Sequence, residues 1–212
     1  MRLKVYAADT SALCNQELFD KLYGKVSESR RRKTDRLHFM KDKWLSLGVE
    51  FLLMCACDDF GLDYAGMEIT ENEFSKPGFK DCSVYFNLSH SGERAMCIMA
   101  DMPVGCDVER IRHANMDIAE RFFSADENES VKSDDDFYRI WTQKESYIKC
   151  TGLGMHMPLN EFSVFTVSKS ARYSFFSPDA ADGYRYAWCV ENLNGKYTCY
   201  DAILWKDMRR FI

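Results

Sequence analysis

Apolar positions in the first third of the chain recur every three or four residues. This spacing places them on one face of an α-helix. We therefore predict one long helix that starts near Ser29 and ends near residues 58–61, where two aspartates precede a phenylalanine and a glycine. Its buried stripe should comprise Leu37, Met40, Trp44, Leu47, Phe51 and Met54.

Runs of β-branched and aromatic residues bounded by turn residues predict strands on both sides of this helix. A short helix over residues 17–23 should follow the first strand, and a turn at residues 91–93 should close a hairpin. Proline and glycine punctuate residues 73–79, which we predict to be a loop. The predicted strands of this part are residues 4–8, 84–89, 95–100 and 104–109.

The rest of the chain should combine helices with a largely antiparallel sheet. Residues 117–123 are helical in pattern, and a capping box at Ser124 starts another short helix. A helix over residues 137–150 should have its N-cap among three aspartates, 134–136, and end at Gly152. The predicted strands are residues 162–168, 171–177, 184–192 and 196–205, with a turn at Asn194-Gly195.

Composition narrows the class of protein. The chain has 212 residues, of which 46% are hydrophobic, and it has no apolar run of about 18 residues that would span a bilayer. The N-terminus lacks the apolar core of a signal peptide, so we expect a cytoplasmic protein with no membrane partner. Nine cysteines without a paired C-x-x-C spacing indicate neither a disulfide framework nor a zinc site. A net charge of −5 argues against a nucleic-acid partner, although residues 30–33 form a basic run that could contact phosphate or start a solvated helix.

Candidate chemistry begins in the strand over residues 104–109. Successive side chains of a strand point to opposite faces, so Asp107 and Glu109 project together while Val104, Cys106 and Val108 pack behind them. Two adjacent carboxylates repel unless a cation or a proton lies between them, which favours a divalent metal. An isolated D-x-E is more often the solvated face of an edge strand. Trp141, Glu145 and Lys149 lie four apart on one helix face, where they could supply a third acid and a cation or merely an exposed ion pair.

Three sequence blocks favour a functional site over a solvated strand face and an exposed ion pair. They are Phe86-Asn87-Leu88-Ser89-His90-Ser91, Val104-Gly105-Cys106-Asp107-Val108-Glu109 and Trp141-Thr142-Gln143-Lys144-Glu145-Ser146-Tyr147-Ile148-Lys149. In order and spacing they resemble the signature blocks of 4'-phosphopantetheinyl transferases of the larger, surfactin-synthetase-activating (Sfp) type. Further similarity lies at Ser75-Lys76-Pro77, Ala119-Glu120-Arg121-Phe122-Phe123-Ser124, Gly152-Leu153-Gly154 and Pro158-Leu159, so the match covers about residues 75–164.

The resemblance implies an α+β fold that is a pseudo-dimer of two similar halves, each a helix packed on an antiparallel sheet. The halves would be residues 1–102 and 103–212, with coenzyme A bound in the cleft between them. The helices from Ser29 and Phe137 would be equivalent. Because both halves lie in one chain, a monomer is expected.

The resemblance also implies the reaction and the roles of residues. The enzyme would move 4'-phosphopantetheine from coenzyme A to a serine of an apo acyl, peptidyl or aryl carrier protein and release 3',5'-ADP, thereby activating fatty-acid, polyketide or nonribosomal peptide synthases. Asp107, Glu109 and Glu145 would bind Mg²⁺, Glu145 would act as base, as metal ligand or as both, and Lys149 would stabilise or protonate the departing phosphate. The expected nucleotide contacts are Arg31, Lys33, Ser46, Lys76, Pro77, Ser89 and His90.

One position departs from the family pattern. The first long helix often carries an arginine just before a small residue, whereas Leu45 precedes Ser46 here, so Lys43 or the basic run would have to supply that charge. Met155 and Met157 would either grip a carrier helix or fill the core. His38, His113 and His156 share no metal spacing and are expected at the surface or in packing. Two other functions stay open: a metal-dependent phosphohydrolase of nucleotide diphosphates, and a coenzyme A-binding module without catalysis.

Overall fold

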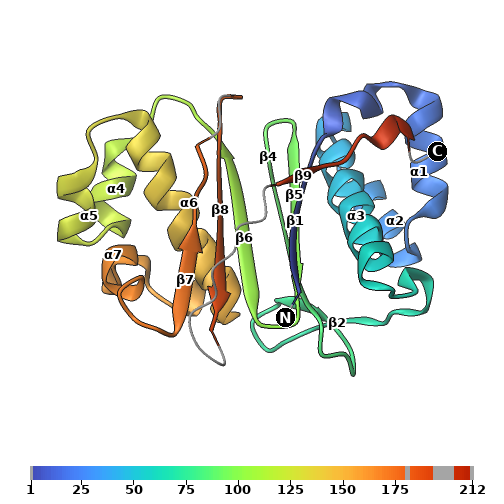
Figure 1. Ribbon diagram of the computed structural model, residues 1–212. Coiled ribbons are helices and arrows are strands. Elements are labelled where there is room, and N and C mark those ends of the chain that lie inside the picture. The colour runs from blue at the N-terminus through green and yellow to red at the C-terminus, as the bar shows by residue number, and fades with distance from the viewer. Residues whose placement is uncertain (1, 180–181, 193–202, 211–212) are drawn as a thin grey trace.

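Two β-sheets stand face to face in the computed structural model, with helices on their outer sides (Figure 1). The structure describes residues 2–179, 182–192 and 203–210. The layers therefore run helix, sheet, sheet, helix. The mixed α+β class with antiparallel pairing is confirmed.

The first sheet has the strand order β4-β5-β1-β9. Strand β1 pairs antiparallel with β5 and parallel with β9, and β4 and β5 form the expected hairpin. Helix α3 packs on the outer face of this sheet, beside α1 and α2 (Figure 1). The elements are β1 (Leu3–Asp9), α1 (Gln16–Lys25), α2 (Glu28–Asp35), α3 (Met40–Phe60), β4 (Tyr85–Ser91), β5 (Arg94–Ala100) and β9 (Leu204–Trp205).

The second sheet has the strand order β6-β8-β7 and is antiparallel. Helix α6 lies along its outer face and is covered in turn by shorter helices (Figure 1). The elements are β6 (Val104–Arg110), α4 (Met116–Phe122), α5 (Ala125–Ser130), α6 (Asp134–Thr151), α7 (Val164–Val167), β7 (Tyr173–Phe176) and β8 (Tyr184–Glu191). Short 3-10 helices lie at Thr10–Cys14, Tyr64–Gly66, Gly154–His156, Leu159–Glu161 and Met208–Arg210.

A layer of buried apolar side chains joins the inner faces of the two sheets. Alternate residues of β1, β5, β6 and β8 meet there, as the period of two along a strand requires. Among them, Val104, Cys106 and Val108 are fully buried, as expected behind Asp107 and Glu109. Separate cores lie under α3 and around α6. The outward face of β6 is thus left to carry the acids toward α6.

The predicted long helix of the first part is wrong in one respect, because it is two helices. Helix α2 ends at Asp35, and Phe39 is an extended N-cap that begins α3. Arg30 forms an ion pair of 2.8 Å with the buried Glu50, although a continuous helix would separate residues 20 positions apart by about 30 Å. The chain therefore folds back, and Met40 is exposed, while Leu47 and Phe51 are buried as expected.

Four further predictions need correction. Residues 77–79 are not loop but strand β3 (Pro77–Phe79), paired with β2 (Ile69–Glu71). Residues 162–168 contain α7 instead of a strand, since Ser163 caps a helical turn there. The N-cap of α6 is Ser133 and not an aspartate. Of the predicted strand 196–205, residues 196–202 and the turn at Asn194-Gly195 lie outside the described residues, and β9 joins the first sheet through β1.

The other sequence-based boundaries hold. The strand at residues 4–8, the helix at 17–23, the capping box at Ser124 and the left-handed Gly152 after α6 are all observed. Among the described residues, no helix has the length and apolarity needed to cross a membrane.

Candidate active site

The three sequence blocks converge on one pocket of about 390 Å³ between β4, β6 and α6. The first two strands are edge strands of different sheets, so the pocket lies where the two sheets meet. Its walls are Leu88, Ser89, His90, Asp107, Glu109, Trp141, Glu145 and Lys149. The structure thus brings together all the predicted acids, Lys149, Ser89 and His90; we call this the acid pocket.

Asp107 is the most constrained acid of the pocket. Its Oδ1 atom accepts hydrogen bonds from Ser89 Oγ at 2.7 Å and from Lys149 Nζ at 2.6 Å. Its Oδ2 atom is buried and has no hydrogen-bond partner within the described part of the chain. Burial by itself would lower the pKa of Lys149, but the Asp107 carboxylate outweighs burial and raises that pKa above its ordinary value. Asp107 and Lys149 are therefore an ion pair with one carboxylate oxygen left over.

The other two acids lie in each other's electrostatic field. Glu109 accepts a hydrogen bond of 2.6 Å from Ser91 Oγ. Burial raises the pKa of Glu109 despite this bond, and the charge of Asp107 raises it further. Burial and then the charge of Asp107 likewise raise the pKa of Glu145. Partly buried carboxylates that repel one another in this way would be stabilised by a cation.

The donor set suits a hard divalent cation. No three His, Cys, Asp or Glu side chains of the described residues already converge closely enough to form a complete metal site. The unpartnered Asp107 Oδ2 nevertheless offers a buried oxygen at the pocket, and Mg²⁺ is usually held by one or two carboxylates together with phosphate oxygens and water. The residues present fit Mg²⁺ on that observation.

Gly105 sets the distance between β6 and α6. A Cβ atom at this position would lie 2.2 Å from the Ser146 carbonyl oxygen and 2.3 Å from the Cys150 amide nitrogen. Only a residue without a side chain lets the two backbones approach this closely. The sequence motif contains this glycine, but the contact with α6 depends on the tertiary packing.

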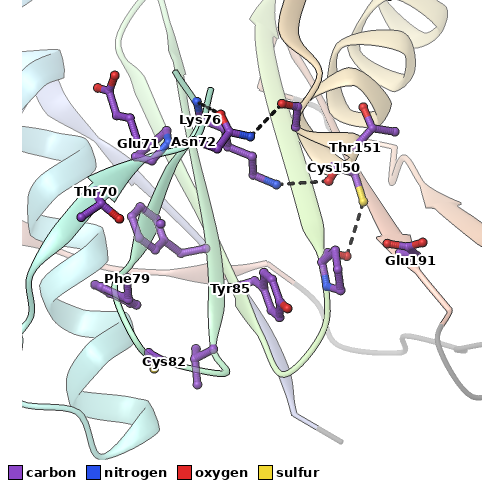
Figure 2. A pocket seen from close by; sticks show the side chains of 16 residues that line it. Thr70, Glu71, Asn72, Lys76, Phe79, Cys82, Tyr85, Cys150, Thr151 and Glu191 are labelled. Atoms are coloured by element: carbon purple, nitrogen blue, oxygen red, sulfur yellow. Dashed lines mark hydrogen bonds between the residues drawn. The ribbon is translucent and has the colours of Figure 1, made fainter. Parts of the chain in front are cut away.

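The far end of α6 is held by residues that precede β4. Lys76 Nζ donates to the Cys150 carbonyl oxygen at 3.1 Å and to Val104 at 3.0 Å, and Asn72 Nδ2 donates to Gly152 at 3.0 Å. Figure 2 shows Lys76 reaching across to Cys150 and Asn72 lying beside it. The bonds to Cys150 and Gly152 satisfy carbonyl groups at the helix end that have no partner within the helix, and the bond to Val104 ties the start of β6 to the same lysine.

Lys76 and Pro77 line a second pocket, of about 380 Å³, and not the acid pocket. Burial lowers the pKa of Lys76. Two of the three ammonium hydrogens are used by carbonyl groups, so one remains for a ligand. The two pockets lie at opposite ends of the seam between β4 and β6.

The predicted basic run has mixed surroundings. Arg30 is bound to Glu50, Arg32 to Glu28, and Arg31 donates to the Gly24 carbonyl at 3.4 Å, while Lys33 is exposed. Burial in the acid pocket lowers the pKa of His90. The positive charges of Lys149, Lys33 and Arg30 lower it further. Helix α2 therefore contributes positive potential to the mouth of the acid pocket.

Several other predicted residues are placed away from open pocket surface. Ser46 is buried, and its hydroxyl shares a 2.9 Å hydrogen bond with Thr34. His38 and His113 are exposed, and His156 packs against Phe74. Met157 is half-buried.

Sequence reasoning missed a buried ion pair behind the acid pocket. Lys144 Nζ donates to Glu127 at 2.5 Å and to the Phe162 carbonyl oxygen at 2.7 Å, and both charged side chains are inaccessible to solvent. Glu127 also accepts from the Ser124 and Val164 amides. This network fixes α5 and the segment before α7 against α6, and the capping-box position of Glu127 was its only sequence signal.

Comparison with known proteins identifies relatives of this chain. The family model described as the 4'-phosphopantetheinyl transferase superfamily matches residues 103–200. A 4'-phosphopantetheinyl transferase of Bacillus subtilis is 35% identical over 153 residues, which is 68% of each chain. The 4'-phosphopantetheinyl transferase gsp of Aneurinibacillus migulanus is 31% identical over 194 residues, covering 82% of this chain and 80% of its own. Sfp of Bacillus subtilis strain 168 is 29% identical over 186 residues, covering 84% and 83%.

The chain therefore belongs to the 4'-phosphopantetheinyl transferase superfamily. Its similarity to Sfp and gsp over most of both chains confirms the resemblance to the Sfp type.

Proposed function

We propose that this protein transfers 4'-phosphopantetheine from coenzyme A to a serine of an apo acyl, peptidyl or aryl carrier protein and releases 3',5'-ADP. The observation that carries the proposal is the acid pocket, where Asp107 is held through one oxygen while its other oxygen has no partner among the described residues. The names of the relatives support the group transferred.

The residues that would hold Mg²⁺ are Asp107, Glu109 and Glu145. When bound, the ion would neutralise charge on the phosphate oxygens of coenzyme A. Without it, the raised pKa values of Glu109 and Glu145 indicate that this pocket tolerates its own negative charge poorly.

Glu145 would act as the base that takes the proton of the carrier serine. A serine hydroxyl is a poor nucleophile at neutral pH and needs a base as it attacks the phosphorus attached to pantetheine. Burial and the neighbouring Asp107 charge raise the pKa of Glu145, which makes it a stronger base than an exposed carboxylate. A carboxylate that also binds metal is a weaker base, so Glu145 can serve one role fully or both in part.

Lys149 is placed to stabilise the leaving phosphate. Its ammonium group donates to Asp107 and, at 3.2 Å, to Ser89, which leaves one hydrogen for a phosphate oxygen. The Asp107 carboxylate keeps Lys149 charged by raising its pKa. Its role is therefore electrostatic first, with proton donation limited by that raised pKa.

The nucleotide would bind across the same seam. The exposed Lys33 supplies positive charge for phosphate, with Arg31 beside it on α2, and His90 at the pocket mouth supplies a ring N–H donor. The remaining hydrogen of Lys76 and the ring of Pro77 face the second pocket, where they would meet the nucleoside. The buried Ser46 would contact the ligand only after releasing Thr34.

We further propose that residues 1–102 and 103–212 are equivalent halves, with α3 and α6 as matching long helices on matching sheets. One chain supplies both walls of the acid pocket, which supports a monomer. We propose that it acts in the cytoplasm. The physiological carrier would belong to a fatty-acid, polyketide or nonribosomal peptide synthase.

Mass spectrometry of a panel of apo-carriers incubated with the protein, coenzyme A and Mg²⁺ tests the reaction. A gain of one phosphopantetheinyl group is expected on at least one carrier, and no gain on any would contradict the proposal. Release of 4'-phosphopantetheine without a carrier would instead indicate a phosphohydrolase. Calorimetric binding of coenzyme A without turnover would indicate a binding module.

A further inference from the structure

Three alternate polar side chains of β4 replace backbone pairing between the two sheets. Asn87, Ser89 and Ser91 all point toward the free edge of β6, as alternate residues of one strand must. Asn87 Oδ1 accepts from the Cys106 amide at 2.9 Å, and Ser89 Oγ accepts from the Val108 amide at 3.3 Å. Ser91 Oγ accepts in the same way from Arg110 at 3.2 Å.

The spacing of this contact matches on both strands. Every second residue of β4 meets the amide of every second residue of β6, in the same chain direction. The amides of an edge strand need partners when they are buried, and side-chain oxygens supply them here. We refer to Asn87, Ser89 and Ser91 as the polar ladder.

Two hydroxyls of the polar ladder also donate hydrogen bonds to carboxylates. Ser89 donates its hydrogen to Asp107 at 2.7 Å, and Ser91 donates its hydrogen to Glu109 at 2.6 Å. Each serine therefore accepts from the amide that follows an acid and donates to the carboxylate of that acid. A hydroxyl has one hydrogen, so its direction is determined by these two bonds.

The hydroxyl of Ser89 is fully engaged by its neighbours. Its oxygen accepts from the Val108 amide and from Lys149 at 3.2 Å, and its hydrogen is given to Asp107. It has no hydrogen left for a phosphate oxygen unless it releases Asp107.

We propose that Ser89 and Ser91 are positioning residues, which fix the orientations of the Asp107 and Glu109 carboxylates so that each presents its second oxygen to a divalent cation. Ser91 is the new assignment. Ser89 orients Asp107 in the same way. The inference rests on the proposed metal site, while its test does not depend on transfer.

The test compares Ser91→Ala, Ser91→Thr and Ser89→Ala with wild type. Mn²⁺ is titrated into each full-length protein in the presence of coenzyme A, and the free aqueous ion is followed by electron paramagnetic resonance. Both alanine variants should bind Mn²⁺ about tenfold more weakly or worse, as expected for the loss of an outer-shell partner of a metal ligand. Ser91→Thr keeps the hydroxyl on a half-buried strand position and should stay within about threefold of wild type.

Coenzyme A binding in EDTA separates positioning from direct contact. Calorimetry should show that Ser91→Ala binds coenzyme A without metal within about twofold of wild type, because Ser91 is not among the residues that line the acid pocket. Ser83→Ala is the matched control, since Ser83 is exposed just before β4 and should change neither measurement.

Three results would overturn the inference. They are an unchanged Mn²⁺ affinity in Ser91→Ala, an equally weakened Ser91→Thr, or a several-fold loss of metal-free coenzyme A binding in Ser91→Ala. If wild type binds Mn²⁺ as described but modifies no carrier, the proposed function fails and this inference stands.

Discussion

Gly105→Ala perturbs the distance between the two elements that carry the acid pocket. The added Cβ would lie 2.2 Å from the Ser146 carbonyl oxygen and 2.3 Å from the Cys150 amide nitrogen. Both obstacles are backbone atoms, so no side-chain rotation relieves the contact. Strand β6 is held in place by its hydrogen bonds to the polar ladder and by its buried core residues. Helix α6 must therefore move outward.

The size of the movement follows from these contacts. To reach an ordinary separation of 3.4 Å, the two backbones must part by about 1 Å. Helix α6 carries Lys149, whose ammonium lies 2.6 Å from Asp107 across the same interface. A shift of about 1 Å in a catalytic group lowers kcat by about 100-fold, and overpacking lowers the free energy of unfolding by about 1–3 kcal/mol.

Phosphopantetheine transfer measured by mass spectrometry, together with urea unfolding, checks this prediction. Gly24→Ala is the matched control, because a Cβ at Gly24 meets nothing within 4 Å and the residue lies on the exposed side of α1. It should leave the transfer rate unchanged and slightly stabilise the helix. A Gly105→Ala enzyme with a transfer rate within twofold of wild type would refute the reasoning.

Three further outcomes are expected. Lys76→Met removes one hydrogen bond to the end of α6 and one to the start of β6, so urea unfolding of the ligand-free protein should show a loss of about 1.5–3 kcal/mol. Unchanged stability would contradict a structural role. Lys144→Met leaves Glu127 buried without its cation and should cost about 3–5 kcal/mol of unfolding free energy. Adding Glu127→Gln should restore part of that loss. A double variant no more stable than Lys144→Met would argue against the pair. EDTA should abolish transfer and added Mg²⁺ should restore it, so persistent transfer in EDTA would contradict a metal at Asp107.

The strands that carry the acid pocket could be predicted because their signals are local. Runs of strand-forming residues bounded by turn residues located β4, β5, β6 and the hairpin. The period of two along a strand placed Asp107 and Glu109 on one face. That β4 and β6 are edge strands of different sheets, joined by side chains, is a tertiary property that these local signals do not encode.

The errors arose where tertiary contacts decide local structure. Residues 36–39 follow a helical pattern, yet the pairing of Arg30 with Glu50 requires the chain to turn there. The apolar residues after 162 resemble a strand, but the Val164 amide is bound by Glu127, which favours a helical turn. The sequence gives no sign that Lys144 is buried, because its partner Glu127 lies 17 residues away.

The acid pocket itself is tested most directly by one isosteric substitution. Asp107→Asn keeps the shape of the side chain and removes the charge that pairs with Lys149 and would bind Mg²⁺. Asp101→Asn is the control, since Asp101 pairs with Arg2 in the turn between β5 and β6. With coenzyme A, Mg²⁺ and an apo-carrier, wild type and Asp101→Asn should add one phosphopantetheinyl group per carrier, and Asp107→Asn should add none. Transfer by Asp107→Asn at the wild-type rate would contradict the account.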